Sequence, residues 1–260
     1  MLWRSCASVQ GVKLTLIRSA TLRLDYGGHT LLVDPQLDPA GARDAVPNTP
    51  NPRRSPLGEL PIPAEQVIEG VDALLVTHLH RDHFDDTARE LLPRHLPVFC
   101  QPPDTERLHA DGFTDVRPVH GDATLDDILI ARTEGQHGVG EIGAAMAPVS
   151  GFVLAAPAEP TVYIAGDTIL CDEVRAAVAE YRPAYIVVNA GAAQFNSGGP
   201  IVMDNDDVAQ LSREAPAATI VAVHFETVSH STQTRAELRA LDLPNVVVPD
   251  DGAALEGAAP

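Results

Sequence analysis

The most chemically suggestive stretch of the sequence is VTHLHRDHFDD, residues 76–86, which places three histidines and an aspartate within six positions. Imidazole nitrogens and carboxylate oxygens bind divalent transition metals well. His78 and His80 are two residues apart, so their side chains project to the same side of an extended segment. Asp82 and His83 follow one turn later and can reach a neighbouring position. One metal ion could not easily take all four side chains from one short loop, whereas two adjacent metal ions could share them.

Three further candidate ligands lie downstream, each where a predicted strand ends. His137 follows the segment ILIART, Asp167 follows TVYIAG, and His224 follows TIVAV. Taken singly, each has an ordinary explanation, because a lone histidine is more often a surface or core residue and an aspartate at such a place can cap the next helix. Since loops at strand ends commonly carry functional groups, their joint occurrence behind the 76–86 loop favours metal ligation over an accidental, solvated histidine cluster.

The elements that must position these side chains follow from the hydrophobic pattern. Alternating apolar and polar residues over 12–26, followed by a Gly-Gly turn, predict an antiparallel start. The apolar run 71–77 predicts a buried strand that ends at the histidines, and 85–96 predicts a short helix capped by Asp85 or Asp86.

The rest of the chain alternates strands and helices. Further strands are predicted at 97–100, 115–119, 127–133, 151–156, 161–168, 184–191, 218–225 and 245–249, and helices at 104–110, 171–182, 205–215 and 232–241. Two runs of strands, each followed by strand–helix alternation, predict an α/β fold of two packed mixed sheets with outer helices, a four-layer αββα sandwich.

Length and composition agree with a globular protein that has a core of useful size. The chain has 260 residues, of which 45% are hydrophobic and 21% charged, and we expect a single domain over 1–260. The net charge of −18 disfavours nucleic-acid binding, because so acidic a surface repels phosphate backbones. The three cysteines form no CxxC pair, which predicts reduced thiols. The N-terminal start has no apolar run of signal-peptide length, so we expect a cytoplasmic location. No segment has the apolar length of a membrane span.

One segment, residues 36–63, is rich in proline and has little periodicity. A loop of that length in a compact domain usually has a function, and we expect a lid over the site, with a disordered excursion as the alternative. Arg53 and Arg54 lie on this loop and could hold a phosphate or carboxylate, although a pair of solvated surface charges is the preferred interpretation.

These residues together resemble the metallo-β-lactamase-fold metal-dependent hydrolases. The resemblance is carried by THLHRDH, His137, GDT at 166–168, His224 and LLVDP at 31–35, so it spans most of the chain. Its finer pattern is most similar to the ascorbate-phosphate lactonase-like and N-acyl-phosphatidylethanolamine phospholipase D-like branch. His80 stands where the diiron flavoprotein branch usually has glutamate, which disfavours a redox role.

The resemblance implies a binuclear metal site. His78, His80 and His137 would hold one metal ion, Asp82, His83 and His224 would hold the other, and Asp167 would bridge both. Asp34 would orient ligand side chains from outside the site, or would merely form a turn before Pro35. Ligands of nitrogen and oxygen without thiolate suit zinc first, with manganese or iron as alternatives.

The implied activity is that of a metal-dependent hydrolase, in which a metal-bound hydroxide cleaves a small ester, lactone or phosphoester. Asp82 could also act as a catalytic residue that shuttles a proton to the leaving group. Two other classes stay open. A metal-dependent nuclease or phosphodiesterase is disfavoured by the acidic balance, and a non-catalytic metal-binding module is disfavoured by the complete ligand set. We expect a small-molecule substrate, and the chain leaves assembly into a homo-oligomer open.

Two other positions near the predicted ligands have no assigned role. His230 could reach substrate, but a solvated histidine before a helix is the preferred interpretation. Asn189 either lines the floor of the site or only turns the chain. The remaining histidines carry no ligand spacing and are expected to be structural or superficial: His29, His95, His109 and His120.

Overall fold

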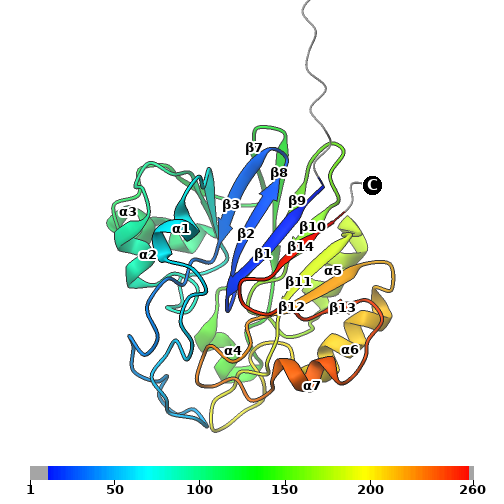
Figure 1. Ribbon diagram of the computed structural model, residues 1–260. Helices are drawn as coiled ribbons and strands as arrows, with labels where there is room; N and C mark the ends of the chain where they lie inside the picture. Colours follow the sequence, from blue (N-terminus) through cyan, green and yellow to red (C-terminus); the bar gives the residue numbers. More distant parts are fainter. Residues whose placement is uncertain (1–10, 258–260) are drawn as a thin grey trace, which may run out of the picture.

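A computed structural model describes residues 11–257 of the chain (Figure 1). Cys6 and the N-terminal start, on which the expectation of no secretory signal rests, lie outside the described residues. Seven strands form each of two mixed sheets. The first sheet has the order β14-β1-β2-β3-β4-β5-β6, in which β1 to β3 are antiparallel and β3 to β6 are parallel. The second has the order β13-β12-β11-β10-β9-β8-β7, in which β10 to β13 are parallel.

The strands of the first sheet are β1 (Lys13–Arg18), β2 (Thr21–Tyr26), β3 (His29–Val33), β4 (Ala73–Val76), β5 (Val98–Cys100), β6 (Val116–Pro118) and β14 (Ala254–Glu256). Those of the second are β7 (Asp122–Leu125), β8 (Ile128–Glu134), β9 (Ser150–Ala155), β10 (Val162–Ile164), β11 (Tyr185–Asn189), β12 (Thr219–Val223) and β13 (Val246–Val247). The helices are α1 (Ala64–Ile68), α2 (Asp86–Leu91), α3 (Thr105–Ala110), α4 (Gly140–Met146), α5 (Asp172–Tyr181), α6 (Asn205–Glu214) and α7 (Arg235–Arg239), with a 3₁₀ turn η1 (Pro102–Asp104) before α3.

Successive side chains of a strand point to opposite faces of its sheet, and in the central strands β4 and β11 both faces are buried. In β4, Leu75 lies in the core between the two sheets, whereas Leu74 and Val76 pack under the helices α1 to α3. In β11, Val187 lies in the same central core, whereas Ile186 packs under α5 and α6. Figure 1 shows α1 to α3 on one side of the paired sheets and α5 to α7 on the other. This arrangement confirms the predicted four-layer sandwich.

The proline-rich segment 36–63 is irregular apart from an isolated bridge between Arg43 and Ser55. Its base is anchored by Arg18, whose guanidinium is fully buried and donates hydrogen bonds to the carbonyls of Gln36, Asp38 and Gly58. The segment also contacts the loops that follow β11 and β12. The backbone amide of Asn196 donates to the carbonyl of Asn48 (2.7 Å), and the backbone amide of Leu57 donates to the carbonyl of Thr227 (2.8 Å). Its role as a lid stays a prediction.

None of the helices between residues 11 and 257 has the length and hydropathy of a membrane span. The two cysteines in this range, Cys100 and Cys171, are buried and form no disulfide there.

Candidate metal centre

The histidine-rich loop begins where β4 ends and is closed by the start of α2. The backbone amides of His83 and Phe84 both donate to the carbonyl of His80, at 2.9 and 3.0 Å, which turns the chain back on itself. Phe84 is fully buried and anchors the turn, and Asp85 caps α2 by accepting a hydrogen bond from the amide of Ala88 (2.9 Å). The tight turn therefore keeps the four candidate ligands of this loop beside the sheet edge.

The other three candidate ligands come from the ends of strands in the second sheet. His137 follows β8, Asp167 follows β10 and His224 follows β12. Asp167 is preceded by Gly166, which has a φ of 70° and would place a Cβ only 2.6 Å from the carbonyl oxygen of Ser150. Only glycine fits that backbone position without strain, and this explains the glycine of the GDT motif.

The structure brings all seven residues together in two groups. Within each group the candidate ligand atoms lie within 4.8 Å of one another. One group holds His78, His80 and His137, and the other holds Asp82, His83, Asp167 and His224. In the first, Nε2 of His78 and Nδ1 of His80 are 2.9 Å apart. In the second, Nε2 of His83 and Nε2 of His224 are 3.3 Å apart, and Asp82 Oδ2 is 3.5 Å from His224 Nε2.

Asp167 lies between the two groups. Its Oδ2 atom is 3.2 Å from His83 Nε2 and 3.4 Å from His137 Nε2. The same oxygen is 3.9 Å from His78 Nε2, and Oδ1 is 3.9 Å from His224 Nε2. Asp167 thus faces histidines of both groups, and the bridging role that the family resemblance implies for it stays a prediction.

Outer contacts hold the ligands in place. Asp34 is buried, and its carboxylate accepts hydrogen bonds from Thr77 Oγ1 (2.7 Å), the Thr77 amide (2.8 Å) and His83 Nδ1 (2.8 Å). His137 Nδ1 donates to the carbonyl of Ile201 (2.7 Å). Asn189 at the end of β11 donates to Asp167 Oδ1 (2.7 Å), so it supports the ligand rather than only turning the chain.

These outer contacts test whether the residues fit metal ions. Since a carbonyl and a carboxylate can only accept, His137 and His83 each carry their proton on Nδ1. Nε2 is then the atom that would bind a metal ion in each residue, and both Nε2 atoms face Asp167. Partners that fix the tautomer of a metal-ligating histidine in this way are typical of metal sites. The donor set and its orientation fit two divalent ions.

Charge and burial shape the ionisation of the site. Burial, together with the nearby imidazoles of His83 and His80, lowers the pKa of His78 well below its ordinary value, so its lone pairs are available at neutral pH. Burial would raise the pKa of Asp167, but the neighbouring histidines outweigh it and hold that pKa well below the usual range. The same holds for Asp82, where the hydrogen bond from His224 is the main opposing contribution. Both carboxylates are therefore ionised, as ligands must be.

Metal binding at His83 is expected to release a proton at neutral pH. Burial disfavours its imidazolium, but the charges of Asp167 and Asp34 outweigh burial and raise the pKa of His83 well above its ordinary value. In the metal-free protein His83 is thus doubly protonated at neutral pH, and a metal ion must displace the second proton. Metal affinity should therefore increase with pH until the pH passes that raised pKa. Zinc titration calorimetry at pH 7 in two buffers of different ionisation enthalpy measures the proton release. Equal heats in both buffers would contradict the prediction.

The arginines and the additional histidine singled out from the sequence belong to neither ligand group. Arg53 and Arg54 are exposed, and Arg54 pairs with Asp44 within the same loop. Both arginines are therefore surface charges, which is the interpretation preferred from the sequence. The expectation of a solvated His230 is wrong, because only 7% of this residue is exposed. Its ring stacks on Phe195 with centroids 6.5 Å apart. No local sequence signal separates it from a surface histidine.

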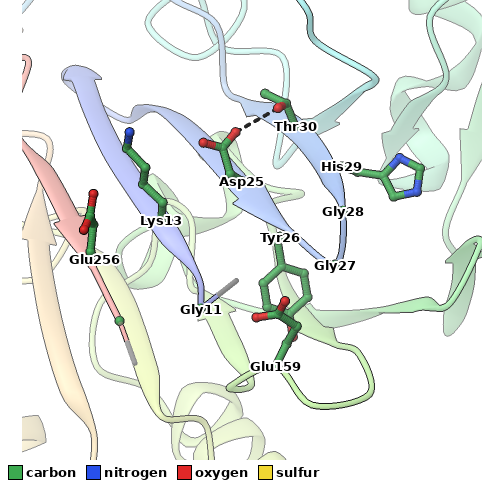
Figure 2. Close-up of a pocket in the computed structure, with 11 residues that line it drawn as sticks. Gly11, Lys13, Asp25, Tyr26, Gly27, Gly28, His29, Thr30, Glu159 and Glu256 are labelled. Carbon is green, nitrogen blue, oxygen red and sulfur yellow. Dashed lines mark hydrogen bonds between the residues drawn. The ribbon is translucent and has the colours of Figure 1, made fainter. Parts of the chain in front are cut away.

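A hollow of about 580 Å³ lies elsewhere, at the turn between β2 and β3 (Figure 2). Its lining includes Lys13, Asp25, His29, Glu159 and Glu256. Because β3 and β4 are parallel and the metal ligands follow the carboxyl end of β4, this hollow lies at the opposite end of the strands. It is not part of the candidate metal centre.

Comparison with known proteins agrees with the fold and the site. The family model described as a beta-lactamase superfamily domain matches residues 29–225. Together with the three-histidine group and the histidine–aspartate group, the fold defines a metal-dependent hydrolase of the metallo-β-lactamase superfamily. Within it the chain belongs to the UPF0173 metal-dependent hydrolase family. The UPF0173 protein YddR of Bacillus subtilis is 36% identical over 249 residues, which cover 93% of this chain and 98% of that protein.

Two solved structures have nearly the same fold. An isothiocyanate hydrolase from Delia radicum gut bacteria superposes with a TM-score of 0.90 and 34% identity, covering 95% of this chain and 100% of that one. A possible metal-dependent hydrolase from Veillonella parvula has a TM-score of 0.91 and 33% identity, covering 94% of this chain and 98% of that one.

Proposed function

We propose that this protein is a binuclear metal-dependent hydrolase that cleaves a small, uncharged electrophile: an ester, a lactone or an isothiocyanate. The observation that carries the proposal is the position of Asp167 between two groups of converging imidazole nitrogens. Two divalent ions held there would supply hydroxide near neutral pH by lowering the pKa of a shared water, and would polarise the carbonyl or thiocarbonyl of the substrate.

The ligand roles follow from the two groups. His78, His80 and His137 would hold one ion, and Asp82, His83 and His224 the other, with Asp167 shared. In hydrolysis of an ester or lactone the water oxygen bonds to the carbonyl carbon, the bond to the alcohol oxygen breaks, and a water proton must reach that oxygen. With an isothiocyanate, water adds across the carbon–nitrogen double bond, a proton goes to the nitrogen, and the resulting thiocarbamate breaks into an amine and carbonyl sulfide. Asp82 is the partly exposed carboxylate of the site, with 19% of its side chain accessible, so it is placed to pass that proton outward.

The surroundings favour an uncharged substrate over a phosphoester. Within residues 11–257, Asp82 and Asp167 form ion pairs only with histidines and not with lysine or arginine. The two carboxylates therefore hold no lysine or arginine beside the site that could bind a phosphate group. A hollow of about 270 Å³ borders His137. Apart from Gln136 and His137 it is lined by small or apolar residues, namely Gly135, Gly138, Val139, Gly140, Gly143, Ala144 and Ala147. Such a lining suits a small apolar group.

Each substrate class has its own support. The isothiocyanate hydrolase that is 34% identical to this chain acts on one of them. Esters and lactones resemble an isothiocyanate in having an electrophilic carbon. The LLVDP and AGDT segments, which resemble those of the lactonase-like branch, support lactones as candidate substrates. A nuclease role is disfavoured by the net charge of −18.

Metal-dependent turnover of neutral substrates tests the proposal. Protein stripped with dipicolinate and reloaded with zinc, manganese or iron(II) would be assayed with phenyl acetate, δ-valerolactone, phenethyl isothiocyanate and bis(p-nitrophenyl) phosphate. We expect turnover only near two bound ions per chain, with at least one neutral substrate faster than the phosphodiester. Inactivity of the fully loaded protein on all four substrates, or equal activity of the stripped protein, would overturn the proposal.

A further inference from the structure

The loop that follows the last metal ligand returns to the site at His230. The chain leaves β12 at His224, which has a φ of 68°, and turns through Phe225 and Glu226. The carbonyl of His230 then accepts a hydrogen bond from the amide of Gln194 on the loop after β11 (3.1 Å). His230 is thus fixed by its backbone to a loop that begins at Asn189, the partner of Asp167.

The side chain of His230 is buried beside the site without a hydrogen bond. Only 7% of the residue is exposed, and Nδ1 is fully buried with no partner. Within residues 11–257 no side-chain hydrogen bond holds either ring nitrogen, in contrast to His83 and His137, whose Nδ1 atoms are both held. Nδ1 of the candidate ligand His224 is likewise buried without a partner. A buried polar atom without a partner disfavours folding, so the His230 ring gains by bonding to a molecule that enters the site.

The ring lies within electrostatic reach of both ligand groups. Burial lowers the pKa of His230, so it is a neutral imidazole with one N–H to donate. Four ligands act on it: Asp82, His137, Asp167 and His224.

Phe195 connects this ring to the apolar side of the site. It stacks on His230 and packs against the cluster of Ala193, Ile201 and Val202, with Ile142 and Met146 of α4. The carbonyl of Ile201 holds the metal ligand His137. Phe195 therefore links the unpartnered imidazole of His230 to the apolar cluster whose Ile201 orients His137.

We propose that His230 is a further catalytic residue, which donates a hydrogen bond to the substrate atom that gains negative charge as the bond breaks. This inference rests on the proposed function and concerns the same site. Donors placed at developing charge typically change kcat by about 100-fold or more and act little on substrate binding. No covalent step is assigned to His230, and the metal ligands keep their roles.

Three substitutions of His230 test this role. His230→Leu removes both ring nitrogens, His230→Asn keeps a polar atom near Nδ1, and His230→Gln keeps one near Nε2. We expect His230→Leu to lower kcat about 100-fold with KM within about threefold, while one of the two amide variants recovers at least about tenfold of that loss. The recovering variant identifies the donating nitrogen. His120→Leu, at an exposed histidine, is the matched control and should behave as wild type.

Binding of phenylboronic acid gives a readout that does not depend on turnover. Its tetrahedral hydroxide adduct mimics the charged intermediate, so His230→Leu should weaken its Kd at least about tenfold on protein loaded with two zinc ions. Wild type that binds the boronate but hydrolyses nothing would overturn the proposed function and, with it, the catalytic role of His230. Wild type that hydrolyses a substrate, with His230→Leu equally active, would overturn this inference alone. Unchanged kcat and Kd in His230→Leu, loss of zinc in all three variants, or no boronate binding by wild type would overturn the inference.

Discussion

Replacing Asp167 by asparagine is expected to lower hydrolysis at least about 1000-fold, which equals about 4 kcal/mol of transition-state stabilisation. Asp167 is the shared member of the two ligand groups, with Oδ2 at 3.2 Å from His83 Nε2 and 3.4 Å from His137 Nε2. An amide has the shape of the carboxylate but not its charge. It would therefore leave Asp82 as the only charged ligand to balance the two divalent ions that the groups would hold.

The metal content of Asp167→Asn should fall with its activity. We expect elemental analysis to find about one zinc ion or fewer per chain where wild type binds two. Asp172→Asn is the matched control, because Asp172 opens α5 five residues later with a fully exposed side chain. Two tightly bound ions together with activity within about tenfold of wild type would show that the bridging role is wrong.

The ligand set could be predicted from the sequence because each ligand is tied to a local pattern. His78, His80, Asp82 and His83 share one short loop, and the apolar run before it marks the strand that delivers them. The later ligands each follow a short apolar strand. When strands of one sheet run parallel, as β10, β11 and β12 do, their carboxyl ends meet at one edge. Spacing and strand pattern therefore indicated that distant residues converge, and the family resemblance supplied their division into two groups.

The supporting contacts could not be predicted, because no local pattern encodes them. His137 is oriented by the carbonyl of Ile201, which is 64 residues away and belongs to no motif. The burial of His230 depends on Phe195 and Gln194, which reach it only in the folded chain. The helix α4 was also missed, since GEIGAAM contains two glycines and presents no buried residue. Tertiary contacts decide these features, whereas local sequence decides the ligand loop.

Replacing Asp34 by alanine is expected to weaken both metal binding and the fold. The carboxylate satisfies the Thr77 amide, the Thr77 hydroxyl and His83 Nδ1, all of them buried. Its removal leaves these donors unpaired, which should lower the free energy of unfolding by about 3 kcal/mol. His83 would also lose the partner that aims its Nε2 at the site, so zinc affinity should fall about 100-fold.

Asparagine at the same position separates the two causes. Asp34 has a φ of 43°, a conformation that asparagine tolerates better than alanine. Asp34→Asn keeps one accepting oxygen but loses the charge that raises the pKa of His83, so both its stability and its zinc affinity should lie between those of wild type and Asp34→Ala. Asp126→Ala is the matched control, since Asp126 has a φ of 47° but an exposed side chain.

Urea denaturation of the metal-free proteins and zinc competition with a chromophoric chelator measure these two effects independently. Working without metal matters, because bound zinc would itself stabilise the fold and mix one effect with the other. If Asp34→Ala and Asp126→Ala lose equal stability, the loss comes from the backbone conformation they share. If Asp34→Ala binds zinc as tightly as wild type, the contact between Asp34 and His83 does not orient the ligand. We expect Asp34→Ala to have both a lower free energy of unfolding and a lower zinc affinity than Asp126→Ala.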